Sequence, residues 1–357
     1  MFKKKQLAIC IVLVMALVLA ACGNGGGTQP AAPANGNGDE TPPPAGETFE
    51  FIINHLVALD DPLHLSWLHF AELLEERSEG RIQVTIFGNR VISNSDLEAA
   101  ESVRQGIAHM TSTPPSSAAA LGNVAGFRIF DFPYIFETLD DLYLYFDSDL
   151  FMGISNELEA NTGVRALPGY SIGWVNVMTV SDPINNLADM SGLRIRTMPA
   201  DVQMGIISAV GASPTPVAWG ELFTAVQQGV VDGFITSTSL MVSERFYEIC
   251  DYLLNWQILA NAHVPQVNVA WLDSLPADLR EIWEGAFVDF VRYARARLAQ
   301  AEYDSLDHMR AAGVTIVDLD DALRAQFRDA TESVFYDFED EAGPGTVAAA
   351  RALVGRL

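Results

Sequence analysis

Lysine is almost missing from this 357-residue sequence. The three lysines, Lys3, Lys4 and Lys5, stand at the N-terminus, and every other basic residue is an arginine. The sequence has 18 arginines against 46 aspartates and glutamates, and its formal net charge is −25. Without the three N-terminal lysines the net charge is about −28. Proteins that bind nucleic acid or anionic surfaces need a basic stripe, so this charge balance argues against a nucleic-acid partner.

Cysteine is scarce as well. Cys10 and Cys22 fall in the N-terminal leader, and Cys250 is then the one cysteine left in the rest of the sequence. No intramolecular disulfide can therefore hold the fold. An exported chain without disulfides depends on a large hydrophobic core, and the roughly 310 residues after the leader are enough for two lobes or one large domain.

Metal-binding and cofactor-binding motifs are also missing. The sequence has no His-Glu-x-x-His, no Cys-x-x-Cys and no phosphate-binding glycine loop. Its six histidines are scattered, and His64 with His69 lacks the spacing of metal ligands. We expect no catalytic residue, no metal and no cofactor, and we keep an exported hydrolase as the leading enzyme alternative.

The only long apolar run, residues 7–21, is too short and wrongly flanked for an ordinary membrane-spanning helix. It follows three lysines and ends in Leu19-Ala20-Ala21-Cys22, which resembles the lipobox of bacterial lipoproteins. We predict a signal peptide over residues 1–21 and lipidation of Cys22, with an uncleaved N-terminal anchor as the alternative. Residues 22–47 are rich in Gly, Pro, Asn and Ala and are predicted to be a flexible linker. The protein is then extracytoplasmic and lipid-anchored to the cell membrane.

Strand-like and helix-like segments alternate after residue 48. The pattern predicts a strand over Phe49–Asn54, a helix over Pro62–Arg77 and a second strand over Ile82–Phe87. Asn94-Ser95-Asp96 can cap a helix that ends at Arg104, and residues 107–111 are predicted to form the next strand. Such alternation is typical of parallel α/β units.

Two segments repeat one pattern. Residues 98–111 and the stretch from Glu221 onward each place a helix ending in Val-x-Gln-Gly before a short apolar strand. The glycine suits a left-handed helix cap, and related α/β lobes explain the repeat better than the general preference of such turns for glycine. A helical pattern of about 50 Å from Pro276 to Ala312, ended by Gly313, is longer than one lobe is wide. This helix is expected to brace both lobes.

Several strings resemble one family, the DctP-like solute-binding receptors of tripartite ATP-independent periplasmic (TRAP) transporters, here in lipoprotein form. The most specific strings lie between Asp189 and Gly233. The strings are Phe70-Ala71-Glu72, Ser78-Glu79-Gly80-Arg81-Ile82, Phe130-Asp131-Phe132-Pro133-Tyr134-Ile135-Phe136, Asp189-Met190-Ser191-Gly192-Leu193-Arg194-Ile195-Arg196-Thr197-Met198-Pro199, Gly211-Ala212-Ser213-Pro214-Thr215-Pro216-Val217, residues 221–233 and Phe246-Tyr247-Glu248.

The resemblance implies an α/β, two-lobed periplasmic-binding-protein-like (Venus flytrap) fold with a long helix spanning both lobes. Lobe 1 is expected over residues 48–173 with part of 262–300, and lobe 2 over 174–261 with part of 301–357. The implied function is that of an extracytoplasmic receptor, not an enzyme, which binds a small organic acid and delivers it to TRAP transporter membrane subunits. A binding protein for an ATP-driven (ABC) importer or a sensor kinase remains the alternative.

Arg196 matches the family arginine that pairs with the ligand carboxylate, and a guanidinium grips a carboxylate through two parallel hydrogen bonds. Arg194 and Arg196 share one face of the expected strand. Trp219 falls where the family places an aromatic lid, with a buried core tryptophan as the alternative. Thr236 and Ser237 follow a strand from which relatives offer a polar contact, usually from Asn.

Asn54 and His55 end the first strand, where lobe 1 would face the cleft, although His55 is equally suited to a structural role. Many relatives have a second arginine ahead of the Asp-Met string, whereas this sequence has an uncharged stretch that includes Asn176, which we include among the candidate contacts. Pro114 and Pro115 stand where some relatives have a polar contact. The pocket is therefore expected to favour a monocarboxylate with an aromatic or branched body.

Overall fold

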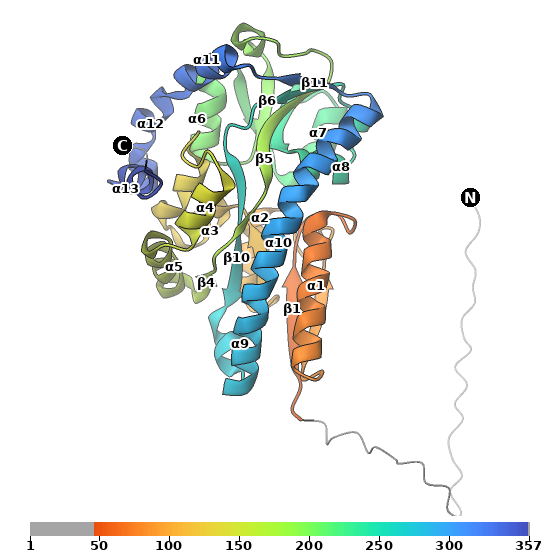
Figure 1. Ribbon diagram of the computed structural model, residues 1–357, viewed down its shortest axis with the longest axis vertical. Coiled ribbons are helices and arrows are strands. Elements are labelled where there is room, and N and C mark those ends of the chain that lie inside the picture. Colours follow the sequence, from red (N-terminus) through yellow and green to blue (C-terminus); the bar gives the residue numbers. More distant parts are fainter. Residues whose placement is uncertain (1–45, 356–357) are drawn as a thin grey trace, which may run out of the picture. The chain divides into compact units, whose positions relative to one another are not determined.

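A computed structural model describes residues 46–355. In that part of the chain, eleven strands form one mixed sheet in the order β2-β1-β3-β10-β5-β8-β6-β7, with β4 beside β10 and β9 between β5 and β11 (Figure 1). The strands are β1 (Phe49–Asn54), β2 (Ile82–Phe87), β3 (Met110–Thr113), β4 (Val164–Ala166), β5 (Tyr170–Thr179), β6 (Arg194–Thr197), β7 (Ser213–Pro216), β8 (Gly233–Ser237), β9 (Tyr252–Asn255), β10 (Ala260–Asn268) and β11 (Thr315–Asp318).

Helices cover this sheet, and none in the described part is long and apolar enough to cross a membrane. The α-helices are α1 (Pro62–Arg77), α2 (Asp96–Arg104), α3 (Pro115–Gly122), α4 (Leu139–Phe146), α5 (Asp149–Thr162), α6 (Asp201–Ala209), α7 (Leu222–Gln227), α8 (Thr238–Ser243), α9 (Val269–Ser274), α10 (Ala277–Ala312), α11 (Asp321–Thr331), α12 (Ser333–Asp337) and α13 (Thr346–Leu353). Short 3₁₀ turns are η1 (Ala125–Asp131), η2 (Leu187–Met190), η3 (Trp219–Glu221), η4 (Phe246–Glu248) and η5 (Glu339–Ala342).

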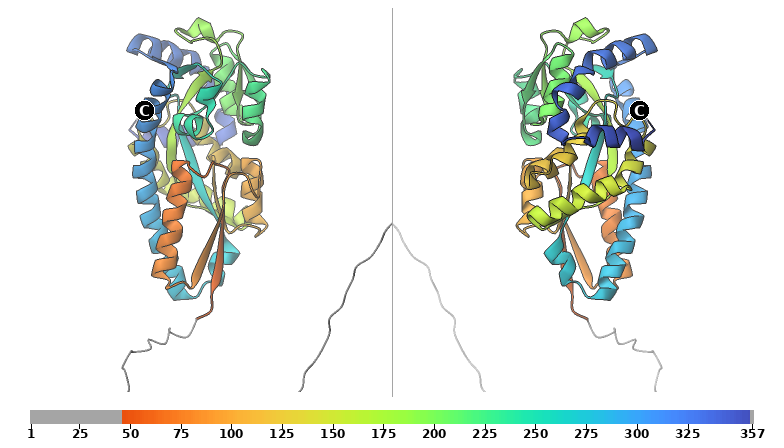
Figure 2. Two further views of the ribbon diagram at one scale, coloured as in Figure 1. Left: turned by 90° about the vertical axis from the view of Figure 1, so that its right-hand side faces the viewer. Right: turned by 90° about the vertical axis from the view of Figure 1, so that its left-hand side faces the viewer.

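The sheet has two parallel parts, one in each lobe. In the first lobe β1 pairs in parallel with β2 and β3, and in the second β6 pairs in parallel with β7 and β8. The long strands β5 and β10 are antiparallel to each other and join the two parts. Figure 2 shows the lobes one above the other, with α10 along one side. The architecture confirms the predicted two-lobed α/β fold.

The long helix forms where the sequence predicts it. Pro276 is the N-cap of α10, and Gly313 ends the helix with a left-handed φ of 95°. Along its length α10 packs against α1 of the first lobe, then against β5 and against α8 of the second. One rigid element therefore contacts both lobes, as expected from its length.

The repeated pattern also marks equivalent places in the two lobes. Gly106 and Gly229 each follow a helix with a left-handed φ, 73° and 66°, and each is followed four residues later by a strand, β3 or β8. The predicted strand over residues 107–111 was wrong in its start, because the amides of Ile107 and Ala108 bond back to the carbonyl of Ser102. The backbone of His109 then bonds to Ile52 and Asn268 of the neighbouring strands, and β3 begins at Met110.

A large core takes the place of disulfides in the described residues. Cys250 is buried and free, and two large apolar clusters fill the space around the sheet. One cluster is strongly aromatic where α1 meets α10: Trp67 and Phe70 stack on Phe290 with ring centroids 4.4 and 4.9 Å apart. Rings packed this closely stabilise the contact beyond their buried area.

The crossing between the lobes is built around Gly173 and Glu302. Gly173 in β5 has φ 115°, and a Cβ at this position would lie 2.2 Å from Oε2 of Glu302 in α10. The Thr238 hydroxyl, at the start of α8, donates to the same oxygen over 2.6 Å. Burial raises the pKa of Glu302 to about 7, against the lowering effect of the Thr238 hydrogen bond. Glu302 thus joins three elements at the place where β5 passes between the lobes.

Replacing Glu302 with Gln is expected to flatten part of the pH dependence of stability. A carboxyl whose folded-state pKa is raised stabilises the fold fully below its unfolded pKa of 4.5, and this contribution is lost as the pH rises through about 7. The free energy of unfolding of Glu302→Gln, relative to wild type, should therefore increase from pH 4.5 to pH 8 in denaturant titrations. The exposed Glu281→Gln of the same helix is the control. A constant difference between Glu302→Gln and wild type over this range would contradict the assignment.

Candidate ligand-binding site

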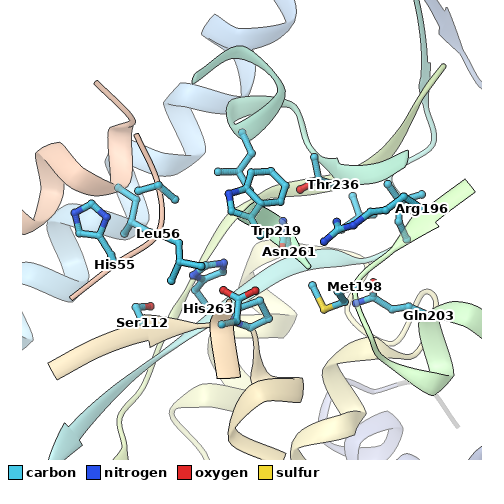
Figure 3. Close-up of a pocket in the computed structure, with 17 residues that line it drawn as sticks. His55, Leu56, Ser112, Arg196, Met198, Gln203, Trp219, Thr236, Asn261 and His263 are labelled. Atoms are coloured by element: carbon cyan, nitrogen blue, oxygen red, sulfur yellow. The ribbon is translucent and has the colours of Figure 1, made fainter. Parts of the chain in front are cut away.

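A small cavity lies between the lobes, and both lobes contribute side chains to it (Figure 3). The centre of a water-sized sphere can move through about 40 Å³ of this cavity. One water needs roughly 10–15 Å³ on the same measure. Polar and apolar residues contribute almost equally to the lining. The polar lining residues are His55, Asp96, Ser112, Arg196, Gln203, Thr236, Asn261 and His263, and the apolar ones are Leu56, Val57, Leu63, Pro114, Val175, Met198, Trp219, Ile235 and Leu240.

Arg196 supplies the permanent positive charge in this lining. It lies in β6, is 3 % exposed, and its Nε donates to the carbonyl of Val217 over 2.9 Å. Burial lowers its pKa to about 10, while nearby Asp96 acts to raise it, so the guanidinium is charged at neutral pH. No carboxylate oxygen of the described residues lies within 4.0 Å of its nitrogens. Its two terminal nitrogens are therefore available to donate hydrogen bonds to a ligand.

Arg194 shows the contrast within the same strand. Its side chain is 47 % exposed and forms an ion pair with Asp232, with Nε–Oδ2 and Nη2–Oδ1 distances of 3.0 and 2.5 Å. Arg194 lies at the exposed start of β6, whereas Arg196 is fixed between β7 and β8. The two arginines differ in burial and in pairing because they occupy different positions along the strand.

Trp219 belongs to the core and to the cavity at once. Its indole is buried, packs against Phe246 with centroids 6.3 Å apart, and lines the cavity 5.7 Å from the Arg196 guanidinium carbon. Its Nε1 has no hydrogen-bond partner in the described residues. The two alternatives from the sequence, lid residue and core residue, therefore do not exclude each other.

Two more predicted contacts, His55 and Thr236, line the cavity. His55 lies beside His64, with 2.9 Å between Nε2 and Nδ1. Burial, and then the neighbouring His64, lower the pKa of His55 to about 3, so its ring is neutral at physiological pH. His55 can offer a hydrogen bond to a ligand but no positive charge.

The structure does not bring the other three predicted residues, Asn54, Ser237 and Asn176, into the lining, because neighbouring groups already hold their side chains. The Asn54 amide donates to two serine hydroxyls behind the strand, at 2.5 and 3.3 Å. Ser237 Oγ accepts from the amide of Asn261, 3.3 Å away. Asn176 bridges backbone groups of Trp174 and Gln257. These side chains shape the strands that carry the site.

Several residues of the lining were not predicted from the sequence. In the sequence, Asp96 indicates only the start of a helix, and it is the first residue of α2, after the Ser95 cap. Asn261 and His263 lie in β10, a strand of mixed polar and apolar residues, and only the sheet topology reveals that this strand crosses between the lobes. Gln203 points into the cavity from α6 while its amide donates to Asp131 over 2.6 Å.

One string, Gly169-Tyr170-Ser171-Ile172-Gly173, matches the Gly-x-Ser-x-Gly pattern of serine hydrolases. That pattern requires an exposed serine on a sharp strand-to-helix turn. Ser171 instead is buried inside β5, and its hydroxyl donates to the Gly173 carbonyl over 2.7 Å. In residues 46–355 there is also no group of three or more His, Cys, Asp or Glu side chains that could hold a metal.

A larger apolar groove, about 820 Å³, runs between α4 and α10. Its three arginines are already engaged: Arg165 pairs with Glu159, Arg292 with Asp289 and Arg295 with Asp147. The interlobe cavity, in contrast, holds a buried and unpaired guanidinium. The cavity is therefore the better candidate for the binding of a charged small molecule.

The lobes touch beside the cavity through Arg90 and Glu244. Arg90 follows β2 in the first lobe, Glu244 ends α8 in the second, and two bonds of 2.8 and 3.0 Å join them. Next to this pair, a Cβ at Gly220 would lie 2.9 Å from the carbonyl oxygen of Asn94. The ion pair thus stabilises the arrangement in which the lobes meet.

Arg90→Ala and Glu244→Ala are each expected to weaken ligand binding about threefold to tenfold. A partly buried ion pair contributes on the order of 1 kcal/mol, and losing it lowers the population of the closed form that retains ligand. Isothermal titration with any carboxylate that stabilises the protein measures the effect. Arg165→Ala, which breaks an ion pair within one lobe, is the control. Equal affinity in all three variants would contradict a role in closure.

Known proteins resemble the chain along most of its length. The family model described as bacterial extracellular solute-binding protein, family 7, matches residues 53–341. The C4-dicarboxylate-binding periplasmic protein DctP of Rhodobacter capsulatus is 28 % identical over 87 % of this chain and 92 % of its own. The 2,3-diketo-L-gulonate-binding periplasmic protein YiaO of Escherichia coli is 25 % identical over 75 % of this chain and 83 % of its own.

Solved structures share the fold. The sugar acid binding protein DctPAm of Advenella mimigardefordensis, in complex with galactonate, has a TM-score of 0.83 at 23 % identity, over 87 % of this chain and 98 % of that one. A TRAP periplasmic solute binding protein of Shewanella oneidensis with bound succinate has a TM-score of 0.80 at 24 % identity, over 86 % and 99 % of the two chains. Both likenesses support the two-lobed fold.

Proposed function

The chain belongs to the bacterial extracellular solute-binding proteins of family 7, and from that premise we propose that it is an extracytoplasmic receptor for a small organic monocarboxylate. It is a binding protein and not an enzyme. It delivers the bound acid to the membrane subunits of a TRAP-type transporter. The relatives whose names specify a ligand include ones that bind dicarboxylates, sugar acids and orotic acid, and carboxylate recognition is the feature that these share.

One observation carries this proposal: the Arg196 guanidinium is buried in the interlobe cavity without a carboxylate partner from the described residues. A buried, unpaired cation is costly to maintain, and a ligand carboxylate offsets that cost. The planar guanidinium can form two parallel hydrogen bonds to one carboxylate. Trp219 covers the same space and excludes water, which strengthens the ion pair.

The restriction to one carboxylate follows from the other charges. His55 and His263 line the cavity, but burial lowers the pKa of each, to about 3 and about 4, so both rings are neutral. The rest of the lining holds no further cation, and its apolar side chains, including Val175, Ile235 and Leu240, can contact the ligand body. A second carboxylate would have no cation to meet it.

Binding proceeds by closure of two lobes whose boundaries we place at residues 48–173 and 174–261, with parts of 262–300 and 301–357 added to the first and second. Arg196 holds the carboxylate from the second lobe, and His55 approaches from the first. The ligand then shifts the population toward the closed form, which the transporter reads. The long helix α10 supports both lobes during this movement.

Membrane attachment is part of the same proposal, although the signal peptide (1–21), Cys22 and most of the linker (22–47) lie outside the described residues. A lipid on Cys22 and a linker of about 25 residues, with a root-mean-square span of roughly 25–30 Å, would keep the receptor near its transporter. Labelling of cells with a palmitate analogue tests this: wild-type protein should be labelled and Cys22→Ala should not.

A thermal-shift screen of organic acids, with neutral sugars and metal salts as controls, tests the receptor function. Ligands that bind the folded state raise its stability by mass action. Stabilisation by monocarboxylates, confirmed by mass spectrometry of the molecule released from purified protein, is the expected result. Stabilisation by neutral sugars or metals alone would overturn the proposal.

A further inference from the structure

Asp96 places a negative charge in the same cavity as Arg196. It is the first residue of α2 in the first lobe, and its side chain lines the cavity that Arg196 enters from the second lobe. Each of the two charges affects the pKa of the other, yet they form no ion pair within 4.0 Å. The cavity therefore presents a cation on one wall and an anion on the other, with a gap between them.

The Asp96 carboxylate lacks a cationic partner in the described residues. No side chain of the described residues donates a hydrogen bond to it. Burial raises its pKa to about 6, and Arg196 opposes that rise from across the cavity. The residue as a whole is partly exposed, and above pH 6 its carboxylate is an anion in a cavity lined by apolar and polar residues alike.

The charges of the cavity wall sum to zero before a ligand arrives. Arg196 contributes one positive charge, Asp96 one negative charge, and His55 and His263 are neutral. A simple monocarboxylate would leave a net negative charge in a cavity removed from water, which is costly. A ligand with one positive group beside its carboxylate would leave the closed cavity neutral and give Asp96 the partner it lacks.

We propose that the ligand is a zwitterion whose carboxylate pairs with Arg196 and whose ammonium or other cationic nitrogen pairs with Asp96. This inference rests on the proposed carboxylate-receptor function and specifies its substrate class. A hydroxyl donating to Asp96 would satisfy a lone pair of the carboxylate but would leave the charge unbalanced. The cationic group is the chemistry that distinguishes this site from one built for a hydroxy acid.

Matched probes test the substrate class. The panel pairs amino acids of varied side chain, and 2-, 3-, 4- and 5-aminopentanoate, with the acids in which hydrogen or hydroxyl replaces the amino group. Thermal shift followed by titration calorimetry at pH 7.5 should find an amino acid as the strongest ligand, bound at least tenfold more tightly than its matched acids. An acid without a cationic group as the strongest ligand would overturn the inference and leave the receptor function intact. If no carboxylate binds, both fail.

Asp96→Asn separates a binding role from a structural one. The variant keeps the size of the side chain at the first position of α2 and is expected to lose at least tenfold in affinity for the amino acid. Its affinity for the matched desamino acid is expected to stay equal or to rise, because the desolvated anion is gone. Equal losses for both members of a pair, or no loss for the amino acid, would overturn the inference. Circular dichroism confirms that the variant is folded.

Proton uptake gives an independent readout. Calorimetry of the strongest ligand in two buffers of different ionisation enthalpy measures the protons taken up on binding. A zwitterion leaves Asp96 ionised, so uptake near zero is expected at pH 7.5. Uptake of about one proton per ligand would mean that Asp96 is neutralised by protonation, and it would overturn the proposed pairing.

Discussion

Replacing Arg196 with alanine is expected to lower the affinity for the carboxylate ligand by about 2–5 kcal/mol, or roughly 30-fold to several thousand-fold. The loss is large because the guanidinium is buried, and the substitution leaves the ligand carboxylate in an apolar cavity without its counter-charge. Arg196→Lys keeps the charge but cannot form two parallel hydrogen bonds, so an intermediate loss is expected. Isothermal titration calorimetry measures each affinity.

Arg194→Ala is the matched control for this prediction. It removes an arginine from the same strand, but one whose side chain is 47 % exposed and paired with Asp232, outside the cavity lining. Its ligand affinity should equal that of wild type, and the folded state of all three variants can be checked by thermal unfolding. Wild-type affinity in Arg196→Ala would exclude Arg196 as the carboxylate contact.

Local chemistry explains why much of the fold was predictable. The strands over Phe49–Asn54 and Ile82–Phe87 and the helix over Pro62–Arg77 have the expected bounds, because their periodicity and end residues act within a few neighbours. Gly313 ends the long helix for the same kind of reason, a left-handed φ that glycine adopts without strain. The strand predicted over residues 107–111 begins later in the structure, because the amides of residues 107 and 108 bond back to the end of α2.

The site was predictable only where one residue type has one dominant chemistry. The motif singled out Arg196, and Trp219, Thr236 and His55 line the same cavity as Arg196. Asn54 lies outside the cavity lining because nearby serines hold its amide, and the end of a strand does not indicate which way an amide points. Asp96 was missed because a carboxylate in the first turn of a helix is commonplace, and its position opposite Arg196 depends on how two lobes meet.

The same dependence on long-range packing makes Phe290 a test of the fold itself. It lies in the middle of α10 and is fully buried. Its ring stacks on Trp67 and Phe70 of α1 and meets Tyr170 of β5 edge-on, with centroids 6.0 Å apart. This one side chain therefore joins the long helix both to the first lobe and to the strand that crosses between the lobes.

Phe290→Ala is expected to lower the free energy of unfolding by about 3–5 kcal/mol, because a large cavity would remain among aromatic rings that cannot collapse into it. Urea titration should show a lower midpoint with an unchanged slope. Val288→Ala is the control: Val288 lies two residues earlier on the same helix but is 56 % exposed, and its loss should cost well under 1 kcal/mol. Equal effects of the two substitutions would mean that α10 is not held by this aromatic contact, and that its role in joining the lobes lies elsewhere along its length.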